Sequence, residues 1–411
     1  MRILYNISIH VYKILITAAS SLNPKAKLWL DGRKNIFEKL ASSVSSLRTP
    51  GSTLIWFHCA SLGEFEQGRP LIEKYKAQKD VKILLTFFSP SGYEIRKDYK
   101  GADLVCYLPA DTPSNAKRFL EIVKPSAVFF VKYEFWFNYL AELKKYDVPT
   151  YLISGIFREE QHFFKFYGSW FRQQFSSFTH FFLQDPRSEE LLHSIGYRNT
   201  TVTGDTRFDR VSEIAKNVRP FPLIEKFKGG QDVLIAGSTW KEDEELIATA
   251  LPEHVKLVIA PHEIDEKHIE AICALFSKQA VLRYSQATES NAAQAQVLVI
   301  DNIGMLSSLY QYGAFAFIGG GFGKGIHNIL EAATFGLPII FGPNYEKFKE
   351  AVDLVKTGGA FAVSGKPEFQ NVTALLRDQQ VLRTASHISK HYVESRTGAT
   401  AKIMAAVKIN S

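Results

Sequence analysis

Cysteine is scarce in this sequence, and recognisable nucleic-acid-binding motifs are missing. Three cysteines, Cys59, Cys106 and Cys273, occur in 411 residues, far apart and without the spacing of metal ligands. This spacing excludes a disulfide framework and a zinc site, and it fits a reducing cytoplasm. The formal charge of +7 favours anionic partners, but the basic residues are dispersed. We therefore expect no nucleic-acid partner.

The N-terminal segment 3–22 is apolar but is interrupted by Asn6, His10 and Lys13. These polar residues predict a helix that lies in a membrane interface rather than one that crosses a bilayer. Basic residues that can meet anionic headgroups follow the segment, namely Lys25, Lys27, Arg33 and Lys34. The alternative is an ordinary N-terminal helix packed on the first domain.

From residue 53 onward, short β-rich apolar runs alternate with amphipathic stretches, which is typical of α/β folds with parallel sheets. The first series of runs comprises residues 54–57, 83–87, 104–107, 127–131, 151–153 and 181–183. The second series comprises residues 233–236, 257–260, 297–300, 314–318 and 339–341. Pro220 and Pro222 lie between the two series. We therefore predict an anchor segment 1–34 and two doubly wound domains, 35–218 and 219–411, that face one cleft.

The first candidate site follows the first predicted strand, at Ser61, Gly63 and Glu64. The S-x-x-E spacing is that of a capping box, in which both side chains only fix the start of a helix. A strand-to-helix turn is also where α/β sheets hold ligands, and Gly63 lets a substrate approach the backbone. Spacing alone leaves both interpretations open.

The second candidate is the glycine-rich segment 319–325, which separates a predicted strand from a predicted helix. Glycines free backbone N–H groups to face a phosphate, and the helix N-terminus adds partial positive charge. His327 is expected near the phosphate, and Glu331, one helical turn later, near ribose hydroxyls. A mobile glycine loop with a surface glutamate is the alternative.

Two further segments carry polar groups at strand ends. Ser238 and Thr239 can cap the next helix or hold a donor phosphate, and the acidic run 242–245 is interpreted as a solvated first turn. Glu134, Trp136 and Asn138 resemble the wall of a sugar site, where rings stack on sugar faces and polar groups bind hydroxyls. The edge of an aromatic core is the alternative for this second segment.

In their order and spacing, these motifs resemble the transferases of 3-deoxy-D-manno-oct-2-ulosonic acid (Kdo), which modify lipid A in Gram-negative bacteria. The resemblance begins at residues 23–27 and 32–33 and includes 61–64, 134–138, 203–209 and 237–239. It closes with residues 319–320, 327–331 and 342–343. The resemblance implies the GT-B fold, with an N-terminal membrane anchor, an acceptor domain and a CMP-sugar donor domain.

The resemblance also implies roles for single residues. Glu64 is expected to act as general base. The acceptor is expected to contact Ser61, Gly63, Glu134, Trp136, Asn138 and Arg33. The donor is expected to contact Ser238, Thr239, Pro261, His262, Gly304, Gly319, Gly320, His327, Asn328 and Glu331.

Several positions depart from the family pattern. His262 and Glu263 stand where the family has arginine and histidine, Met305 where it tends to have glutamate, and Lys347 where asparagine is usual. Gly321 and Ile326 replace the usual serine and glycine. These changes affect the expected CMP contacts more than the reaction class.

We therefore expect an inverting transferase that moves Kdo from CMP-Kdo to a lipid A precursor, without a metal or other cofactor. It is expected at the cytoplasmic face of the bacterial inner membrane, in contact with the lipid surface. One alternative is a nucleotide-sugar epimerase of the same fold. A second is a lipid-binding relative that has lost catalysis.

Overall fold

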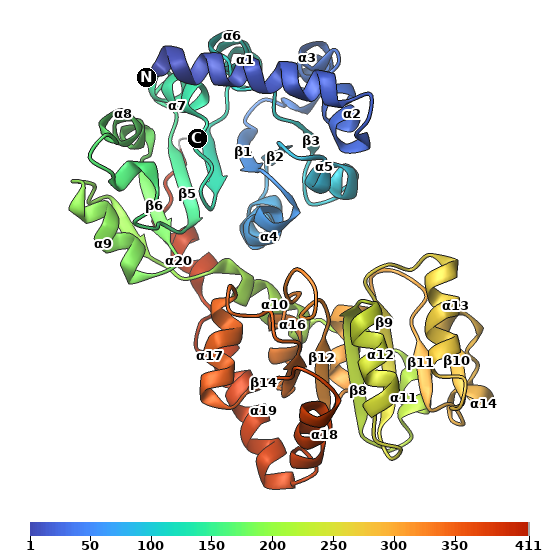
Figure 1. The fold of residues 1–411 in the computed structure, drawn as a ribbon. Coiled ribbons are helices and arrows are strands. Elements are labelled where there is room, and N and C mark those ends of the chain that lie inside the picture. The colour runs from blue at the N-terminus through green and yellow to red at the C-terminus, as the bar shows by residue number, and fades with distance from the viewer. Residues whose placement is uncertain (410–411) are drawn as a thin grey trace. The chain divides into compact units, whose positions relative to one another are not determined.

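The structure, a computed structural model, describes residues 1–409, which form two compact units (Figure 1). The first unit comprises Met1–Arg210 together with the residues from Gly398 onward, and the second comprises Val211–Thr397. Each unit is built around one 7-stranded sheet whose paired strands run parallel. The predicted class, two Rossmann-like α/β domains, is confirmed.

The first sheet has the strand order β3-β2-β1-β4-β5-β6-β7. Its strands are β1 (Thr53–Cys59), β2 (Val81–Phe87), β3 (Leu104–Tyr107), β4 (Ala127–Val131), β5 (Thr150–Gly155), β6 (His180–Leu183) and β7 (Thr200–Val202). Trp56 of β1 packs into an apolar cluster on one face of the sheet, and Ile55 and Phe57 pack into a cluster on the other. Burial on both faces explains why this strand is a continuous apolar run.

Helices cover both faces of the first sheet. They are α1 (Arg2–Ala19), α2 (Pro24–Asp31), α3 (Ile36–Leu47), α4 (Leu62–Lys76), α5 (Pro90–Arg96), α6 (Pro113–Val123), α7 (Phe137–Lys145), α8 (Ser169–Gln174), α9 (Pro186–Ser194) and α20 (Ala399–Ala406). The carboxylate of Asp209 accepts hydrogen bonds from the backbone N–H groups of Gly398 and Thr400, at 2.5 and 2.6 Å. Asp209 thus fixes the start of α20, which returns the chain to the first unit.

The second sheet has the strand order β10-β11-β9-β8-β12-β13-β14. Its strands are β8 (Val233–Thr239), β9 (Lys256–Pro261), β10 (Val281–Arg283), β11 (Val297–Val299), β12 (Phe315–Ile318), β13 (Ile339–Phe341) and β14 (Ala360–Ala362). The helices after α9 are α10 (Thr206–Lys216), α11 (Pro222–Lys228), α12 (Lys241–Ala250), α13 (Glu266–Leu275), α14 (Glu289–Ala292), α15 (Leu306–Leu309), α16 (Leu330–Ala333), α17 (Lys349–Thr357), α18 (Lys366–Leu375) and α19 (Gln379–Glu394).

Both sheets have a topological switch point, where the direction of strand addition reverses. β1 lies between β2 and β4, and β8 lies between β9 and β12. Ligands of open α/β sheets bind outside the carboxyl ends of the strands at such points. The turns after β1, β4, β8 and β12 are therefore the places at which to examine each unit for a site.

The limits of the units differ from the predicted domain limits. The boundary lies within α10, between Arg210 and Val211, whereas the sequence places it at 218/219. Pro222 is the first residue of α11, so the prolines mark a helix start inside the second unit. Residues 1–34 belong to the first unit rather than to a separate segment, and the chain from Gly398 returns to it.

Helix α1 runs across the first unit from near α7 to α2 (Figure 1). Tyr5 packs against Phe137 and Trp170, and Tyr12 packs against Trp29 and Phe88. The opposite face of α1 carries exposed apolar side chains, at Ile3, Leu4, Ile7, Val11, Ile14 and Leu15. None of the helices in residues 1–409 has the length and apolarity needed to cross a membrane.

Candidate functional site

Glu64 lies in the first turn of α4, at the carboxyl end of β1. Its side chain is buried, it accepts a hydrogen bond from the Ser61 hydroxyl, and its Oε1 lies 3.9 Å from Lys132 Nζ. Ser61 is the N-cap residue of α4, but in the described structure its side chain makes no capping hydrogen bond. The capping box is therefore not formed. A carboxylate held by a hydroxyl and an ammonium group is well placed to accept a proton.

Near Glu64, the backbone is accessible at Gly63 and has a strained conformation at Lys132. Gly63 is exposed, and a Cβ added there would meet Ser61 Oγ at 3.7 Å. A substrate can therefore approach the backbone at Gly63, as the sequence predicts. Lys132 directly follows β4 and has a φ of 73°, a left-handed conformation that costs free energy for a non-glycine residue. This turn directs Lys132 toward Glu64.

Glu134 and Trp136 lie in the connection between β4 and α7 and contact each other. Trp136 Nε1 donates a hydrogen bond of 2.8 Å to Glu134 Oε2. His58 Nε2 lies 3.8 Å from the same oxygen, and this buried nitrogen has no hydrogen-bond partner among residues 1–409. His58 Nδ1 is oriented by Thr86 Oγ1, at 2.8 Å. The predicted pair of a carboxylate, Glu134, and an aromatic ring, Trp136, is therefore present. His58, which was not predicted, lies beside the carboxylate.

Asn138 is buried in a network that ties α1 to α7. Its Nδ2 donates to Asn6 Oδ1 at 2.9 Å and to the backbone oxygen of Asp111 at 2.7 Å. The Asp111 carboxylate accepts hydrogen bonds from the Tyr5 hydroxyl at 2.6 Å and from the N–H groups of Asn138 and Tyr139. Burial raises the pKa of Asp111 to about 6. The polar contacts of Asn138 are thus to the protein itself, which differs from the predicted acceptor contact.

Arg33 also binds the protein rather than an open surface. Its guanidinium donates to the backbone oxygens of Trp29, Phe88 and Leu108, at 2.9 to 3.0 Å, and lies 3.9 Å above the Trp29 ring. Burial lowers the pKa of Arg33 to about 9. In this structure Arg33 joins α2 to the loops after β2 and β3, and a contact with the acceptor stays a prediction.

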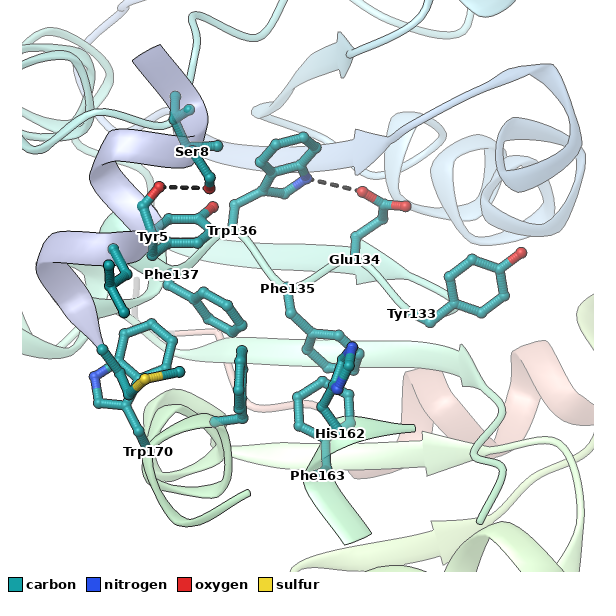
Figure 2. A pocket seen from close by; sticks show the side chains of 14 residues that line it. Tyr5, Ser8, Tyr133, Glu134, Phe135, Trp136, Phe137, His162, Phe163 and Trp170 are labelled. Carbon is teal, nitrogen blue, oxygen red and sulfur yellow. Dashed lines mark hydrogen bonds between the residues drawn. The ribbon is translucent and has the colours of Figure 1, made fainter. Parts of the chain in front are cut away.

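An apolar cavity of about 560 Å³ adjoins this region (Figure 2). Its walls come from α1, from the connection after β4 and from the segment 162–171. Its lining residues are Met1, Leu4, Tyr5, Ser8, Ile9, Tyr133, Glu134, Phe135, Trp136, Phe137, His162, Phe163, Trp170 and Phe171. Glu134 and Trp136 therefore line a cavity, and their contact with an acceptor stays a prediction.

In the second unit, the predicted Ser238 and Thr239 are the last two residues of β8. Ser238 has a φ of 53°, again in the left-handed region at a strand end. Neither residue caps α12, because the N-cap residue is Trp240. Thr239 is buried, and its hydroxyl donates to Glu244 Oε1 at 3.0 Å. The predicted capping role is therefore wrong, and a phosphate contact remains a prediction.

The acidic run that follows is solvated only in part, because Glu242 and Glu245 are exposed whereas Asp243 and Glu244 are buried. Asp243 and Glu244 are each 1% exposed. Asp243 Oδ2 accepts hydrogen bonds from the N–H groups of Trp240 and Gly320, both at 2.9 Å, and its Oδ1 has no partner in the described residues. Burial raises the pKa of Asp243 to about 6. A Cβ at Gly319 would lie 2.8 Å from Asp243 Oδ2 and 2.3 Å from the oxygen of Ser238, so glycine is required there.

Several backbone N–H groups of the glycine loop therefore already donate hydrogen bonds to acceptors within the protein. The N–H of Gly320 binds Asp243, and that of Gly319 binds the backbone oxygen of Gly237. Gly323 and Gly325 donate to the oxygen of Gly320. These amides stabilise the loop, and the predicted phosphate cradle has fewer free donors than the sequence suggests.

Three aromatic rings stack beside the loop. Trp240 and His262 lie 4.7 Å apart, His262 and His327 lie 4.4 Å apart, and Trp240 Nε1 donates to His327 Nε2 at 3.0 Å. Burial, together with the adjacent His262, lowers the pKa of His327. Pro261 ends β9 and places His262 in this stack. The structure thus brings two predicted donor residues, His262 and His327, into contact.

The other predicted donor residues lie in two loops and at the start of α16. Helix α16 begins at Leu330, so His327 precedes it and does not share a helical face with Glu331. Asn328 Nδ2 donates to Glu331 Oε1 at 3.2 Å. Gly304, with a φ of 90°, precedes α15. Within residues 1–409, no group of three or more metal-binding side chains is placed to hold an ion.

The prediction from sequence omitted His58, Lys132, Asp243 and Trp240. A signal was available for Trp240 and Asp243, because both follow a small-residue turn at the end of a strand. His58 and Lys132 also stand at strand ends, but their partners are distant in the chain, namely Thr86 of β2 for His58 and Glu64 of α4 for Lys132.

Comparison with known proteins bears on the family and the fold of the chain. A family described as "3-Deoxy-D-manno-octulosonic-acid transferase (kdotransferase)" matches residues 34–210. A 3-deoxy-D-manno-octulosonic acid transferase from Aquifex aeolicus is 29% identical over 76% of this chain and 83% of its own. One from Chlamydophila psittaci is 28% identical over 82% of this chain and 80% of its own.

A solved structure, the UDP-GlcNAc 2-epimerase from Neisseria meningitidis bound to UDP-GlcNAc, has a TM-score of 0.59 and 14% identity. It covers 86% of this chain and 98% of that chain, and at this identity it supports the fold alone. The two parallel α/β domains match those of glycosyltransferases of the GT-B type. The first unit thus matches the family model of the 3-deoxy-D-manno-octulosonic acid transferases, and most of the chain is similar to transferases of that name.

Proposed function

We propose that this protein is an inverting glycosyltransferase that moves Kdo from CMP-Kdo to a lipid A precursor. The similarity to Kdo transferases over most of the chain carries the reaction class. The geometry around Glu64 supports the assignment of the base. The lipid acceptor is supported by the apolar surfaces of the first unit, which a soluble sugar acceptor does not require.

In the proposed reaction, an acceptor hydroxyl attacks the anomeric carbon of Kdo from the side opposite the phosphate. The new bond joins the acceptor oxygen to that carbon, and the bond from the carbon to the phosphate oxygen breaks to release CMP. Glu64 accepts the hydroxyl proton. Ser61 and Lys132 hold its carboxylate in position. Glu134 and Trp136 bind the acceptor sugar from the adjacent loop.

The second unit is proposed to bind the donor. The glycine loop and the turn at Ser238 and Thr239 lie at the switch point of its sheet, where a nucleotide is expected. His262 and His327 lie beside the loop, and Glu331 is assigned to the ribose hydroxyls. Hydrogen-bond donors and helix dipoles can stabilise a leaving phosphate without a metal. Unchanged turnover in EDTA is expected, and a loss that magnesium restores would refute metal independence.

Helix α1 is proposed to attach the protein to the cytoplasmic face of the inner membrane. Its exposed apolar residues include Ile7, Val11 and Ile14, which are spaced i, i+4 and i+7 and therefore share one helical face. The opposite face packs on the first unit through Tyr5 and Tyr12. Such a helix lies in the interface with its apolar face in the lipid.

Incubation of the purified protein with CMP-Kdo and a lipid A precursor, followed by mass spectrometry of the lipid, tests the proposal. A mass gain of one or more Kdo residues is expected, and the gain also gives the number added. An unchanged lipid, with the donor intact, would refute the function.

The epimerase alternative is favoured only by the shared fold. Conversion of UDP-GlcNAc by the purified protein would establish it. The alternative without catalysis predicts that CMP does not bind, which calorimetry at millimolar nucleotide measures directly.

A further inference from the structure

We propose that the apolar cavity under α1 binds one acyl chain of the acceptor lipid and thereby places its sugar at Glu64. This inference rests on the proposed function and assigns a part of the acceptor that the sequence does not locate. The cavity volume of about 560 Å³ falls within the roughly 300–1,000 Å³ typical of ligand sites.

The cavity wall favours a hydrocarbon over a sugar. Apart from Ser8, Glu134 and His162, the lining side chains are aromatic, aliphatic or thioether groups. Each of these three has a polar contact within the protein: Glu134 Oε2 accepts from Trp136 and the Ser8 hydroxyl donates to the backbone oxygen of Tyr5 (Figure 2), while His162 Nδ1 lies 3.1 Å from the Tyr167 hydroxyl. Beyond Glu134 and Trp136, which are assigned to the acceptor sugar, burial of methylene groups is the main available source of affinity.

The cavity is continuous with the exposed apolar face of α1. Leu4 belongs to both, because it lines the cavity and its side chain is 61% exposed. An acyl chain that leaves the bilayer beside Ile7 meets Leu4 and Ser8 at the cavity wall. This arrangement suits a lipid that is delivered from the membrane on which α1 is proposed to lie.

Cations flank the inner end of the cavity, which suits an anionic headgroup. Lys132 Nζ lies 5.0 Å from the centre of the Tyr133 ring, and Tyr133 lines the cavity. Arg158 lines a second cavity of about 590 Å³ that shares Tyr133 with the first, together with the acidic Glu160. Because Lys132 also contacts Glu64, a headgroup held there has its hydroxyl near the proposed base.

Substitutions that fill the cavity test this assignment. Ser8→Trp and Leu4→Trp introduce an indole from the α1 wall, and both positions are exposed, so the fold should tolerate them. Thr17→Trp is the matched control, because Thr17 is exposed on the same helix and lies outside the cavity lining. Each protein is assayed with an acylated lipid A precursor and with its fully deacylated, water-soluble form.

We expect the two filling variants to raise KM for the acylated acceptor at least about tenfold, the effect of excluding about two methylene groups from an apolar site. KM for the deacylated acceptor should change less than about twofold, and Thr17→Trp should match the wild type with both. Equal changes for both acceptors, or no change for either, would overturn the acyl-chain assignment.

A second measurement does not depend on turnover. A long-chain fatty acid that carries a diazirine should label peptides from residues 1–9, 133–137 and 162–171, and Ser8→Trp should abolish this labelling. Labelling elsewhere, or labelling that Ser8→Trp leaves intact, would refute the cavity as an acyl site. Wild-type protein that is labelled here but transfers no Kdo would instead refute the proposed function.

Discussion

Replacement of Glu64 by glutamine removes the proposed base while it preserves the shape of the site. The glutamine amide has the same length, and its oxygen can still accept the hydrogen bond from Ser61. The change removes the charge that faces Lys132 at 3.9 Å. Because the Lys132 side chain is 28% exposed, loss of this ion pair should cost no more than about 1 kcal/mol of stability.

The expected kinetic effect is much larger than this stability effect. A positioned general base contributes roughly 10²–10⁴-fold to a rate, which corresponds to about 3–5 kcal/mol of activation free energy. An amide cannot accept the proton at neutral pH. We therefore expect Glu64→Gln to lower kcat at least about a hundredfold, with CMP affinity unchanged and the melting temperature shifted by a few degrees at most.

The assay follows transfer from CMP-Kdo to a lipid A precursor by mass spectrometry, with calorimetry of CMP binding in parallel. Glu66→Gln is a matched control, because Glu66 lies on the same helix and pairs with Arg96 at 2.8 Å. That variant should lose a little stability and retain turnover. Near-normal turnover of Glu64→Gln would refute its role as base, and Glu134 would become the candidate.

Three other perturbations test separate parts of the structure. Ile7→Glu combined with Val11→Glu should abolish co-sedimentation with anionic phospholipid vesicles and leave the melting temperature unchanged, since both side chains are exposed; retained binding would exclude α1 as the attachment. Burial raises the pKa of Asp111 to about 6. This carboxyl therefore lowers the free energy of unfolding by up to ~3 kcal/mol as pH rises from about 4 to 6. Asp111→Asn should flatten that decline, as measured in denaturant titrations. If the free energy of unfolding of Asp111→Asn depends on pH as that of the wild type does, this prediction is contradicted. Glu331→Ala should weaken CMP-Kdo binding by roughly 1–3 kcal/mol in calorimetry and leave acceptor affinity unaltered, whereas equal weakening of both would indicate a structural role for Glu331 and its partner Asn328.

Most of the strands that the sequence predicted are buried on both faces, and the mostly half-buried β3 is an exception. β1 and β4 are continuous apolar runs because helices cover both sides of the sheet. β7, β10 and β14 were missed. Each is an edge strand of three residues that are mostly half-buried or exposed, so the sequence contains no apolar run that indicates a strand there. Pairing with a neighbouring strand, which local sequence does not report, makes these segments strands.

The same limit applies to the site in the first unit. Ser61 and Glu64 are three residues apart, so their spacing predicted that they interact. Spacing could not decide between a capping box and a ligand site, and the contact with Lys132 decides against capping alone. That contact depends on β4 lying beside β1 and on the left-handed turn at Lys132. Both features belong to the tertiary structure.

For Asp243, the interpretation from local sequence as a solvated residue was wrong. An acidic residue in the first turn of a helix is favoured by the helix dipole whether it is exposed or buried, so sequence could not separate the two cases. In the structure its carboxylate binds the N–H of Gly320, a group that was expected to face a phosphate. A donor phosphate must therefore either use other amides of the glycine loop or displace Asp243. The second route brings two anions together, which is tolerable only if the carboxyl is protonated, and burial favours that form. Donor binding by this route would strengthen as pH falls toward 6, whereas binding through other amides would not follow the titration of Asp243.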